Sequence, residues 1–318
     1  MCPFNLEIEN RMRQLKGVLL AMISSSTFGL IPLFALPAMK EGVGLDSVLF
    51  YRFAISAVVV GVYLLLRRTD LRVTLKEFGT MFLLGGAYAS TSLFLTTSYL
   101  YIPSGVATTI HFLYPVLVTA IMIVFFKDKI SLSVIIATVL AIGGVYLLSS
   151  GEGQGRISLK GLFMVLSTVV TYAIYIVGVN KSCIRHMEGL KMTFYMLFCC
   201  TIIFGVNILV KGQGLDMMPS ANAVVHIFLL SLIPTLVSDL TLILAIQHVG
   251  STTAAILGCM EPLTAVSMGV LFLEERFGIG QILGVVIVLV AVFIVILSSQ
   301  PGHFSMKRLI PSFIKIRR

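Results

Sequence analysis

Apolar stretches of about twenty residues, separated by short polar segments, fill nearly all of this 318-residue chain. A helix of about 20 apolar residues crosses the hydrocarbon core of a bilayer, and a helix satisfies its backbone polar groups internally, as lipid requires. The alternation typical of a transmembrane β-barrel is absent. The pattern predicts an all-α integral membrane protein with ten transmembrane helices, near 14–36, 46–66, 77–97, 104–126, 131–149, 159–179, 190–210, 224–246, 250–273 and 278–298.

Composition supports this prediction, because hydrophobic residues make up 58% of the chain and charged residues only 12%. A soluble domain is closer to half apolar and one quarter charged. The first span is too long for a signal-peptide core and lacks a small-residue cleavage site, so it is expected to remain as the first helix. The five cysteines fit neither a disulfide framework nor a zinc site. We expect no cofactor and no metal.

The net charge of +9 is compatible with nucleic-acid binding, but its placement argues against that partner. Most of the 23 lysines and arginines fall on one side of the membrane, within 11–16, 67–76, 127–129, 181–191 and 307–318. The positive-inside rule then predicts a multi-pass protein of the cell (inner or plasma) membrane with both termini in the cytoplasm. The basic tail 300–318 is expected to lie on the anionic inner leaflet.

The ten spans form two similar sets of five. A shift of 147 residues aligns 101–149 with 248–296 and places Pro115 on Pro262, while a shift of 144 places Tyr51 on Tyr195. Because five is odd, the second set must be inverted relative to the first. We therefore predict two inverted five-helix repeats, at 14–149 and 159–299, an architecture associated with secondary transport.

Six of the spans carry polar side chains at helical spacing, and we expect them to surround a polar cavity, with the fifth and tenth spans outside it. For a single Ser or Thr, a bond to its own helix or to a neighbouring helix is the preferred explanation, and it is the stripes taken together that favour the cavity. The aromatic residues near this cavity indicate either core packing or a substrate with an apolar part. They include Tyr88, Tyr114, Tyr172 and Tyr175.

Ionisable residues inside spans are costly, at about 2.5–3.5 kcal/mol for a charge at the bilayer centre. Glu261 lies near the middle of the ninth span, directly before Pro262. A poorly solvated carboxyl group there suits the binding of a proton or a cationic group, although a permanently protonated structural Glu is the alternative. Pro115 and Pro262 are expected to break or kink their helices.

Three further ionisable residues are candidates for substrate binding or coupling. Asp239 lies in the eighth span and is either functional or simply hydrated or paired. His111 lies in the fourth span, where a structural hydrogen bond between helices is the alternative. Arg52 lies in the second span, where it either extends to the outer headgroups or attracts an anionic group. Arg52 together with Glu261 indicates a zwitterionic substrate.

Several short motifs occur in a characteristic order: Thr27-Phe28-Gly29, Tyr51-Arg52-Phe53, Tyr114-Pro115-Val116, Glu261-Pro262-Leu263 and Glu274. On these motifs the chain, over about 14–299, resembles the EamA-type members of the drug/metabolite transporter superfamily. The resemblance implies ten helices in two inverted repeats and export of small metabolites such as amino acids. It also implies that Arg52, Glu261 and Glu274 occupy family-matched positions. Asp128 and Phe28 depart from the family pattern, which favours Glu and Trp there.

The leading hypothesis is a secondary transporter, an exporter that works by alternating access around Glu261, Pro262, His111 and Tyr114. If export is coupled to protons, Glu261 is the first choice of proton carrier and Asp239 the second. The expected partners are the lipid bilayer, a small-molecule substrate and protons, with the chain a monomer or a homodimer through its most apolar helices. The alternatives are an intramembrane enzyme and a membrane sensor that transports nothing. No P-loop, H-E-x-x-H or G-x-S-x-G motif is present, so we do not expect an enzyme.

Overall fold

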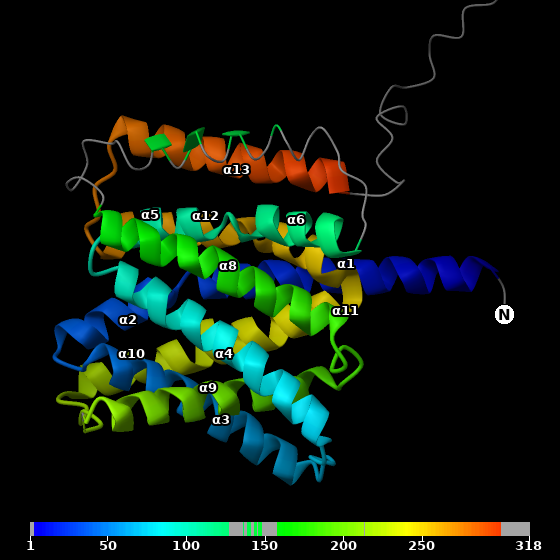
Figure 1. Ribbon diagram of the computed structural model, residues 1–318, viewed down its shortest axis with the longest axis horizontal. Coiled ribbons are helices and arrows are strands. Elements are labelled where there is room, and N and C mark those ends of the chain that lie inside the picture. The colour runs from blue at the N-terminus through cyan, green and yellow to red at the C-terminus, as the bar shows by residue number, and fades with distance from the viewer. Residues whose placement is uncertain are drawn as a thin grey trace, which may run out of the picture.

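The computed structural model describes residues 3–126, 136, 139–140, 143–144, 146–147, 158–212 and 214–299, and in these ranges it contains helices and turns but no strand. The helices lie side by side in one bundle (Figure 1). Within the described ranges, seven helical segments are long and apolar enough to cross a membrane: Gln14–Lys40, Leu45–Leu66, Leu75–Ser98, Ser104–Phe126, Leu159–Lys181, Gly189–Val210 and Ala221–Ala255. The predicted all-α membrane fold is confirmed. The count of ten stays a prediction, because most of 131–149 lies outside the described residues, as does the tail 300–318.

In the first half of the chain, the described helices are α1 (Pro3–Phe28), α2 (Ile31–Lys40), α3 (Leu45–Leu66), α4 (Leu75–Ser98), α5 (Ser104–His111) and α6 (Tyr114–Phe126). The predicted first span differs from the structure in two respects. It is interrupted at Gly29-Leu30, and its helix continues to Lys40 rather than ending near residue 36. An added Cβ at Gly29 would lie 2.5 Å from the backbone oxygen of Glu261. The helix is therefore interrupted at the point where the backbone of α12 comes close to Gly29.

In the second half, the helices are α8 (Leu159–Lys181), α9 (Gly189–Val210), α10 (Ala221–Leu230), a π-helix (Ser231–Val237), α11 (Ser238–Ile256), a 3₁₀ turn (Leu257–Cys259), α12 (Met260–Phe272) and α13 (Ile279–Ser299). The predicted eighth span, 224–246, is longer in the structure. Gly250, with φ of 82°, marks the kink between that span and the ninth, a backbone conformation that glycine adopts without steric cost.

Two transmembrane segments are broken at equivalent positions. α5 and α6 are separated at Phe112-Leu113, and α12 follows the 3₁₀ turn Leu257–Cys259. The alignment of the two repeats that places Pro115 on Pro262 also places Phe112 on Cys259. Pro115 is the second residue of α6 and Pro262 is the third residue of α12, so a proline stands in the first turn of the helix that follows each break. Proline has no N–H to donate and disfavours the helical conformation in the preceding residue, so both breaks have the same local cause.

The two ends of the bundle differ in charge. Loops 67–74 and 182–188 and the start of α1 lie at one end, which we call the basic end; loops 41–44, 99–103, 211–220 and 273–278 lie at the other (Figure 1). The basic end carries Arg67, Arg68, Arg72, Lys181 and Arg185. This end is the one that the positive-inside rule predicts to face the cytoplasm.

Equivalent residues of the two repeats make equivalent close contacts at opposite ends. An added Cβ at Gly17 would lie 2.9 Å from the Cβ of His248, and one at Gly161 would lie 2.9 Å from the Cβ of Tyr101. The alignment of the repeats relates Gly17 to Gly161 and Tyr101 to His248. In each half, a glycine of the first long helix therefore packs against the residue that lies just before the other half's fourth predicted span.

A second equivalent pair joins the long helices to the loops. The Tyr51 hydroxyl donates to the backbone oxygen of Asp216 at 2.8 Å, and the Tyr195 hydroxyl donates to the backbone oxygen of Leu71 at 2.5 Å. The two tyrosines are equivalent in the aligned repeats, and their acceptors lie in loops at opposite ends of the bundle (Figure 1). This arrangement is what an inverted pair of repeats produces.

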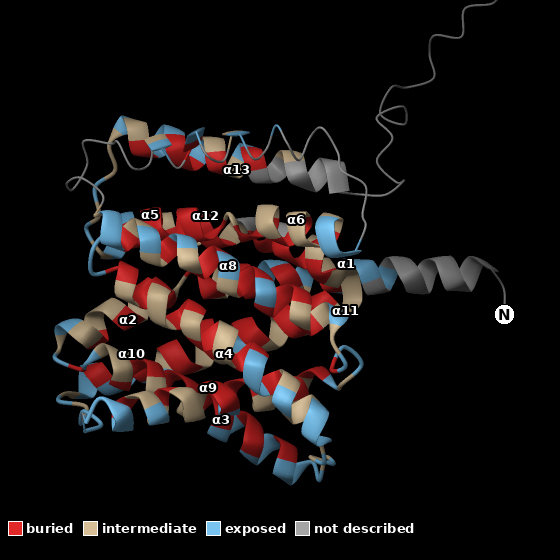
Figure 2. Ribbon diagram, viewed as in Figure 1, coloured by how far each residue is buried: buried red, intermediate tan, exposed pale blue. Residues whose placement is uncertain are grey.

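Buried residues fill the inside of the bundle and exposed residues lie on its outside (Figure 2), and the buried residues include polar side chains such as Arg52, Asp239 and Glu261. Large apolar side chains such as Leu66, Phe125 and Phe163 are more than 70% exposed, as expected of side chains that face lipid. Helix α13 lies at one edge of the bundle (Figure 1), with Ile282 and Val286 on its exposed side. The tenth span is predicted to lie outside the polar interior, and the structure places it there.

Candidate functional site

The eight residues that the sequence singles out for binding or coupling all point into the interior. None is more than 3% exposed: Arg52, Tyr88, His111, Tyr114, Tyr172, Tyr175, Asp239 and Glu261. They come from α3, α4, α5, α6, α8, α11 and α12. Arg52 is 1% exposed and therefore does not extend to the headgroups, which was one of the two interpretations of its position.

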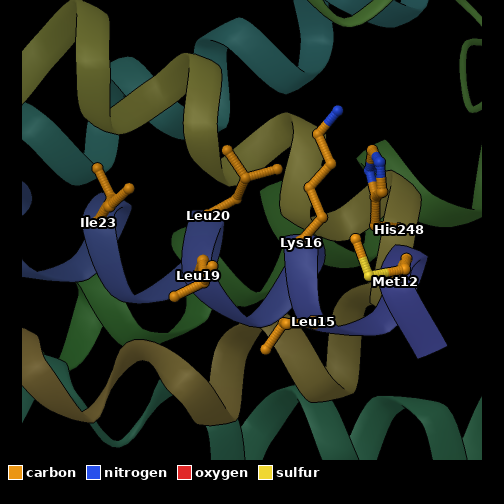
Figure 3. A pocket seen from close by; sticks show the side chains of 7 residues that line it. All are labelled: Met12, Leu15, Lys16, Leu19, Leu20, Ile23 and His248. Atoms are coloured by element: carbon orange, nitrogen blue, oxygen red, sulfur yellow. The ribbon is translucent and has the colours of Figure 1, made fainter.

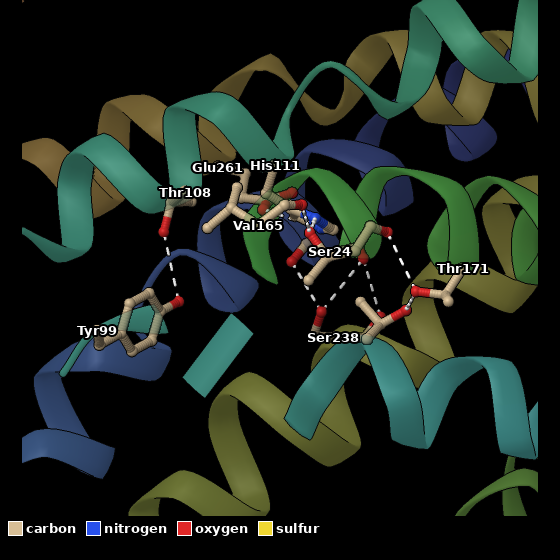
Figure 4. A network of polar contacts seen from close by, with 10 residues as sticks. Ser24, Tyr99, Thr108, His111, Val165, Thr171, Ser238 and Glu261 are labelled. Atoms are coloured by element: carbon tan, nitrogen blue, oxygen red, sulfur yellow. Dashed lines mark hydrogen bonds and ion pairs between the residues drawn. The ribbon is translucent and has the colours of Figure 1, made fainter. Parts of the chain in front are cut away.

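The first part of the site is centred on Glu261 (Figure 4). His111 Nε2 lies 3.8 Å from Glu261 Oε1, and both side chains are almost fully buried. On the other side of the ring, His111 Nδ1 lies 2.7 Å from Thr168 Oγ1. Helices α5, α8 and α12 therefore meet at this point.

The hydrogen bonds around Thr168 determine which histidine nitrogen carries a proton. The Thr168 hydroxyl donates to the Val165 carbonyl at 2.6 Å. Because a hydroxyl has one proton to give, the Thr168 oxygen accepts from His111 Nδ1–H, an assignment made from the network. In a neutral ring, Nε2 is then the acceptor that faces Glu261. One proton can therefore be carried by either facing atom of the pair, His111 Nε2 or Glu261 Oε1.

Tyr114 completes this part of the site. Its side chain is hydrogen-bonded to Glu261, and its hydroxyl lies so close to Gly258 that a Cβ at that position would overlap it. Tyr114 and Glu261 are equivalent residues of the two aligned repeats. Each stands directly before its proline, so the two helix breaks bring them into contact.

The second part of the site contains the two remaining charged residues. The Tyr88 hydroxyl donates to Asp239 Oδ1 at 2.6 Å, and Arg52 Nε donates to Thr235 Oγ1 at 2.7 Å. The Thr235 hydroxyl donates in turn to the Leu230 carbonyl five residues earlier. This bond belongs to the π-helix that contains Pro234, and π-helical turns often occur at functional sites. Because Thr235 and Asp239 are four residues apart, they lie on one helix face.

Tyr172 joins the two parts into one continuous aromatic cluster. Its ring centroid lies 4.7 Å from that of Tyr114 and 5.0 Å from that of His111. Towards the second part, it lies 5.9 Å from Tyr175 and 6.3 Å from Tyr88. These spacings are within the range of favourable ring contacts.

Five buried polar atoms in this cluster have no hydrogen-bond partner among the residues that the structure describes. They are Arg52 Nη2, His111 Nε2, Tyr175 Oη and Glu261 Oε1, together with Ser92 Oγ, which lies one helical turn after Tyr88 on the same face of α4. Native proteins pair most of their buried polar atoms, so a concentration of unpaired donors and acceptors at one place indicates that a ligand or water is bound there. No group of three His, Cys, Asp or Glu side chains that could hold a metal occurs within the described ranges.

The structure adds polar contacts between helices that the sequence did not specify. Ser24 and Ser238 each donate to the other's backbone oxygen, at 2.9 and 3.0 Å, and the Thr91 and Thr171 hydroxyls lie 2.6 Å apart (Figure 4). The polar side chains at helical spacing on these helices indicated in the sequence that such contacts could form. Ser24 and Ser238 are both buried, so these bonds hold α1 against α11 inside the bundle.

Glu275 was not among the candidate residues, although the adjacent Glu274 was matched to the family pattern. Glu275 Oε1 accepts from the Ser104 backbone N–H at 2.6 Å and from its hydroxyl at 2.5 Å, and Oε2 accepts from the Gly105 N–H at 3.1 Å. A carboxylate at a helix N-terminus satisfies free N–H groups and the helix dipole. Glu274 itself is exposed, with φ of 57°.

Comparison with known proteins agrees with this architecture. The model of the EamA-like transporter family matches residues 15–150 and 159–297. The protein named "Uncharacterized transporter YdfC" from Bacillus subtilis (strain 168) is 24% identical over 281 residues, which cover 84% of this chain and 89% of that protein. A solved crystal structure shares the fold, with a TM-score of 0.66 at 12% identity, over 89% of this chain and 98% of the other. The chain therefore belongs to the EamA-like transporter family and is a multi-pass membrane transporter.

Proposed function

We propose that the chain exports small zwitterionic metabolites, such as amino acids, across the cell membrane by alternating access, coupled to protons. The observation that carries this proposal is a single buried cluster with Arg52 in one part and Glu261 in the other, containing five polar atoms without partners in the described chain. Charged groups at this depth are costly and are associated with substrate or ion pathways.

A zwitterion matches the chemistry of the two parts of the site. Its carboxylate would bind Arg52 Nη2 and the Tyr175 hydroxyl, which are both donors, and its ammonium group would bind Glu261. Arg52 already donates through Nε to Thr235, so the guanidinium is oriented before a ligand arrives. The aromatic rings around Tyr172 would face the apolar part of the substrate.

Proton coupling follows from the His111–Glu261 pair. One proton can be carried by either Nε2 or Oε1, which lie 3.8 Å apart. An ammonium group that binds Glu261 competes with that proton, because both neutralise the same carboxylate. Proton and substrate would then occupy the site alternately. Exchange of a proton for a substrate molecule across the membrane requires this alternation.

The arrangement of the halves supports alternating access with the basic end in the cytoplasm. At the end opposite to the basic end, Glu275 holds the start of α5, and Lys160 is bound to Tyr101. Rocking of the two repeats about the broken segments at Phe112-Leu113 and Leu257–Cys259 would open one end as the other closes, as inverted repeats in other transporters do.

The first experiment compares metabolites in the medium of bacterial cells that express the wild-type chain or the Glu261→Gln variant. A matched control is Glu188→Gln, an exposed acidic residue in the loop that precedes α9. We expect an amino acid or similar zwitterion to accumulate with the wild type and with the control, but not with an equally abundant Glu261→Gln protein. Equal export by all three chains would remove Glu261 from the mechanism.

The second experiment tests the coupling with that metabolite in proteoliposomes. An imposed proton gradient should accelerate wild-type transport, whereas substrate exchange without a gradient should persist. If the gradient changes neither the rate nor the direction of wild-type transport, the proton-coupled part of the proposal is wrong, while export by facilitated diffusion remains.

A further inference from the structure

A groove runs along the exposed face of α1 at the basic end of the bundle (Figure 3). Its cavity volume is about 580 Å³. Met12, Leu15, Leu19 and Ile23 line it with apolar side chains that are 46–63% exposed. From Met12 to Ile23 the helix rises by about 16 Å. The groove is therefore an open apolar channel with the length of a substantial part of one acyl chain.

Two basic side chains, Lys16 and His248, lie next to each other at one end of this groove (Figure 3). The Lys16 ammonium makes no hydrogen bond or ion pair with any residue that the structure describes. His248 Nδ1 lies 2.7 Å from the Leu244 carbonyl oxygen. Because a carbonyl only accepts, Nδ1 donates to it, and Nε2 can donate to an anionic ligand when the ring is an imidazolium. The groove thus has apolar side chains along its length and two basic side chains at one end.

The other repeat satisfies its equivalent lysine within the chain. The alignment of the repeats relates Lys160 to Lys16 and Tyr101 to His248. Lys160 Nζ donates to the Tyr101 hydroxyl at 2.8 Å and lies 4.6 Å from the centroid of its ring. At the basic end, the tyrosine is replaced by histidine, and the lysine is left without that partner.

We infer that the groove binds one anionic phospholipid of the leaflet that contacts the basic end. Its phosphate would accept from the Lys16 ammonium and from Nε2–H of the His248 imidazolium, and one acyl chain would lie along Leu15, Leu19 and Ile23. Lysine suits this position because its apolar stem lies along the groove while its ammonium reaches the headgroup region. Basic side chains at the inner surface attract anionic lipids. The inference does not depend on which substrate the protein transports.

The test is a lipid titration of the purified full-length chain in a neutral detergent, followed by native mass spectrometry. The probes are phosphatidylglycerol and phosphatidylcholine with identical acyl chains. We expect wild-type protein to bind one phosphatidylglycerol more tightly than phosphatidylcholine. Lys16→Gln should weaken binding of phosphatidylglycerol about fivefold, the effect of one basic group near a membrane surface.

The matched control is Lys160→Gln, which removes the equivalent lysine at the opposite end and should leave phosphatidylglycerol binding unchanged. Equal affinity for the two lipids, or equal losses in the Lys16 and Lys160 variants, would overturn the inference. If Lys16→Gln does not fold, His248→Gln, which keeps the lysine, should show the same selective loss. Glycerol 3-phosphate at the lipid's concentration should not compete; if it displaces the lipid, the site binds free phosphates and the lipid proposal is wrong.

Discussion

His111 Nε2 lies 3.8 Å from Glu261 Oε1 in the interior of the bundle, and neither atom has a hydrogen-bond partner in the described part of the chain. The separation is too long for a hydrogen bond and short enough for strong electrostatic coupling in a poorly solvated site. The orientation of the histidine ring depends on Thr168, which binds its other nitrogen. A substitution of Thr168 therefore tests the His111–Glu261 pair while both His111 and Glu261 are kept.

Thr168→Val should destabilise the protein because it leaves His111 Nδ1–H buried without an acceptor. The expected loss is about 1–3 kcal/mol in the free energy of unfolding, measured by denaturation in detergent. Thr168→Ser keeps the hydroxyl and should lose much less. Equal stability of the valine and wild-type proteins would show that Nδ1 does not depend on this acceptor.

Arg52→Lys should reduce export even though it keeps the positive charge. Lysine has no counterpart of the Nε–H that donates to Thr235, and it cannot present a second nitrogen in a fixed plane. Loss of one hydrogen bond to a charged group, about 1.5–3 kcal/mol, corresponds to a decrease of roughly tenfold or more in the initial rate at low substrate. Arg67→Lys, at an exposed position at the end of α3, is the control and should transport normally.

Gly17→Ala should destabilise the bundle at the basic end. An added Cβ would lie 2.5 Å from Val249 Cγ1 and 2.9 Å from the His248 Cβ, and overpacking of this kind costs about 1–3 kcal/mol. Gly79→Ala, in α4, meets nothing within 4 Å and should be neutral or slightly stabilising, because alanine favours a helix. Comparison of the two melting temperatures tests the prediction. A wild-type melting temperature for Gly17→Ala would show that α1 and α11 are not in close contact there.

Glu275→Ala should loosen the first turn of α5. The variant removes the acceptors of the Ser104 and Gly105 N–H groups, a loss comparable to that of a helix cap, about 0.5–2 kcal/mol. Amide hydrogen exchange should become faster at the start of α5. Glu188→Ala is the control, because Glu188 precedes α9 but makes no capping hydrogen bond. Unchanged exchange in the Glu275 variant would contradict the capping role.

The sequence predicted helix ends well where apolar runs are bounded by polar residues. The span expected at 46–66 is α3, Leu45–Leu66, and the span expected at 190–210 is α9, Gly189–Val210. Hydrophobic length is a local property, so it can be read from the chain alone. The repeat was also visible, since Gly17 and Tyr51 have counterparts at 161 and 195 that make equivalent contacts.

Features that depend on contacts between distant segments were not predicted. Glu275 binds Ser104, which lies 171 residues earlier, and no local pattern distinguishes Glu275 from the adjacent Glu274. The interruption at Gly29-Leu30 lies where α12 approaches α1 through the backbone of Glu261. For Arg52, the sequence left two interpretations open, because only packing decides whether a long side chain reaches the surface or is enclosed.

The equivalent contacts of Gly17 with His248 and of Gly161 with Tyr101 have a thermodynamic consequence. A carrier that returns to its starting state must pass through inward-facing and outward-facing forms of similar free energy, or it will remain in one of them. If each half adopts in one form the conformation that the other half has in the other form, the two forms contain the same kinds of contact between the halves. Most of the difference in free energy between the inward-facing and outward-facing forms then cancels. The remaining difference in free energy depends on positions where the two halves have different residues. One of these positions is occupied by His248 beside Lys16 in one place and by Tyr101 beside Lys160 in the other.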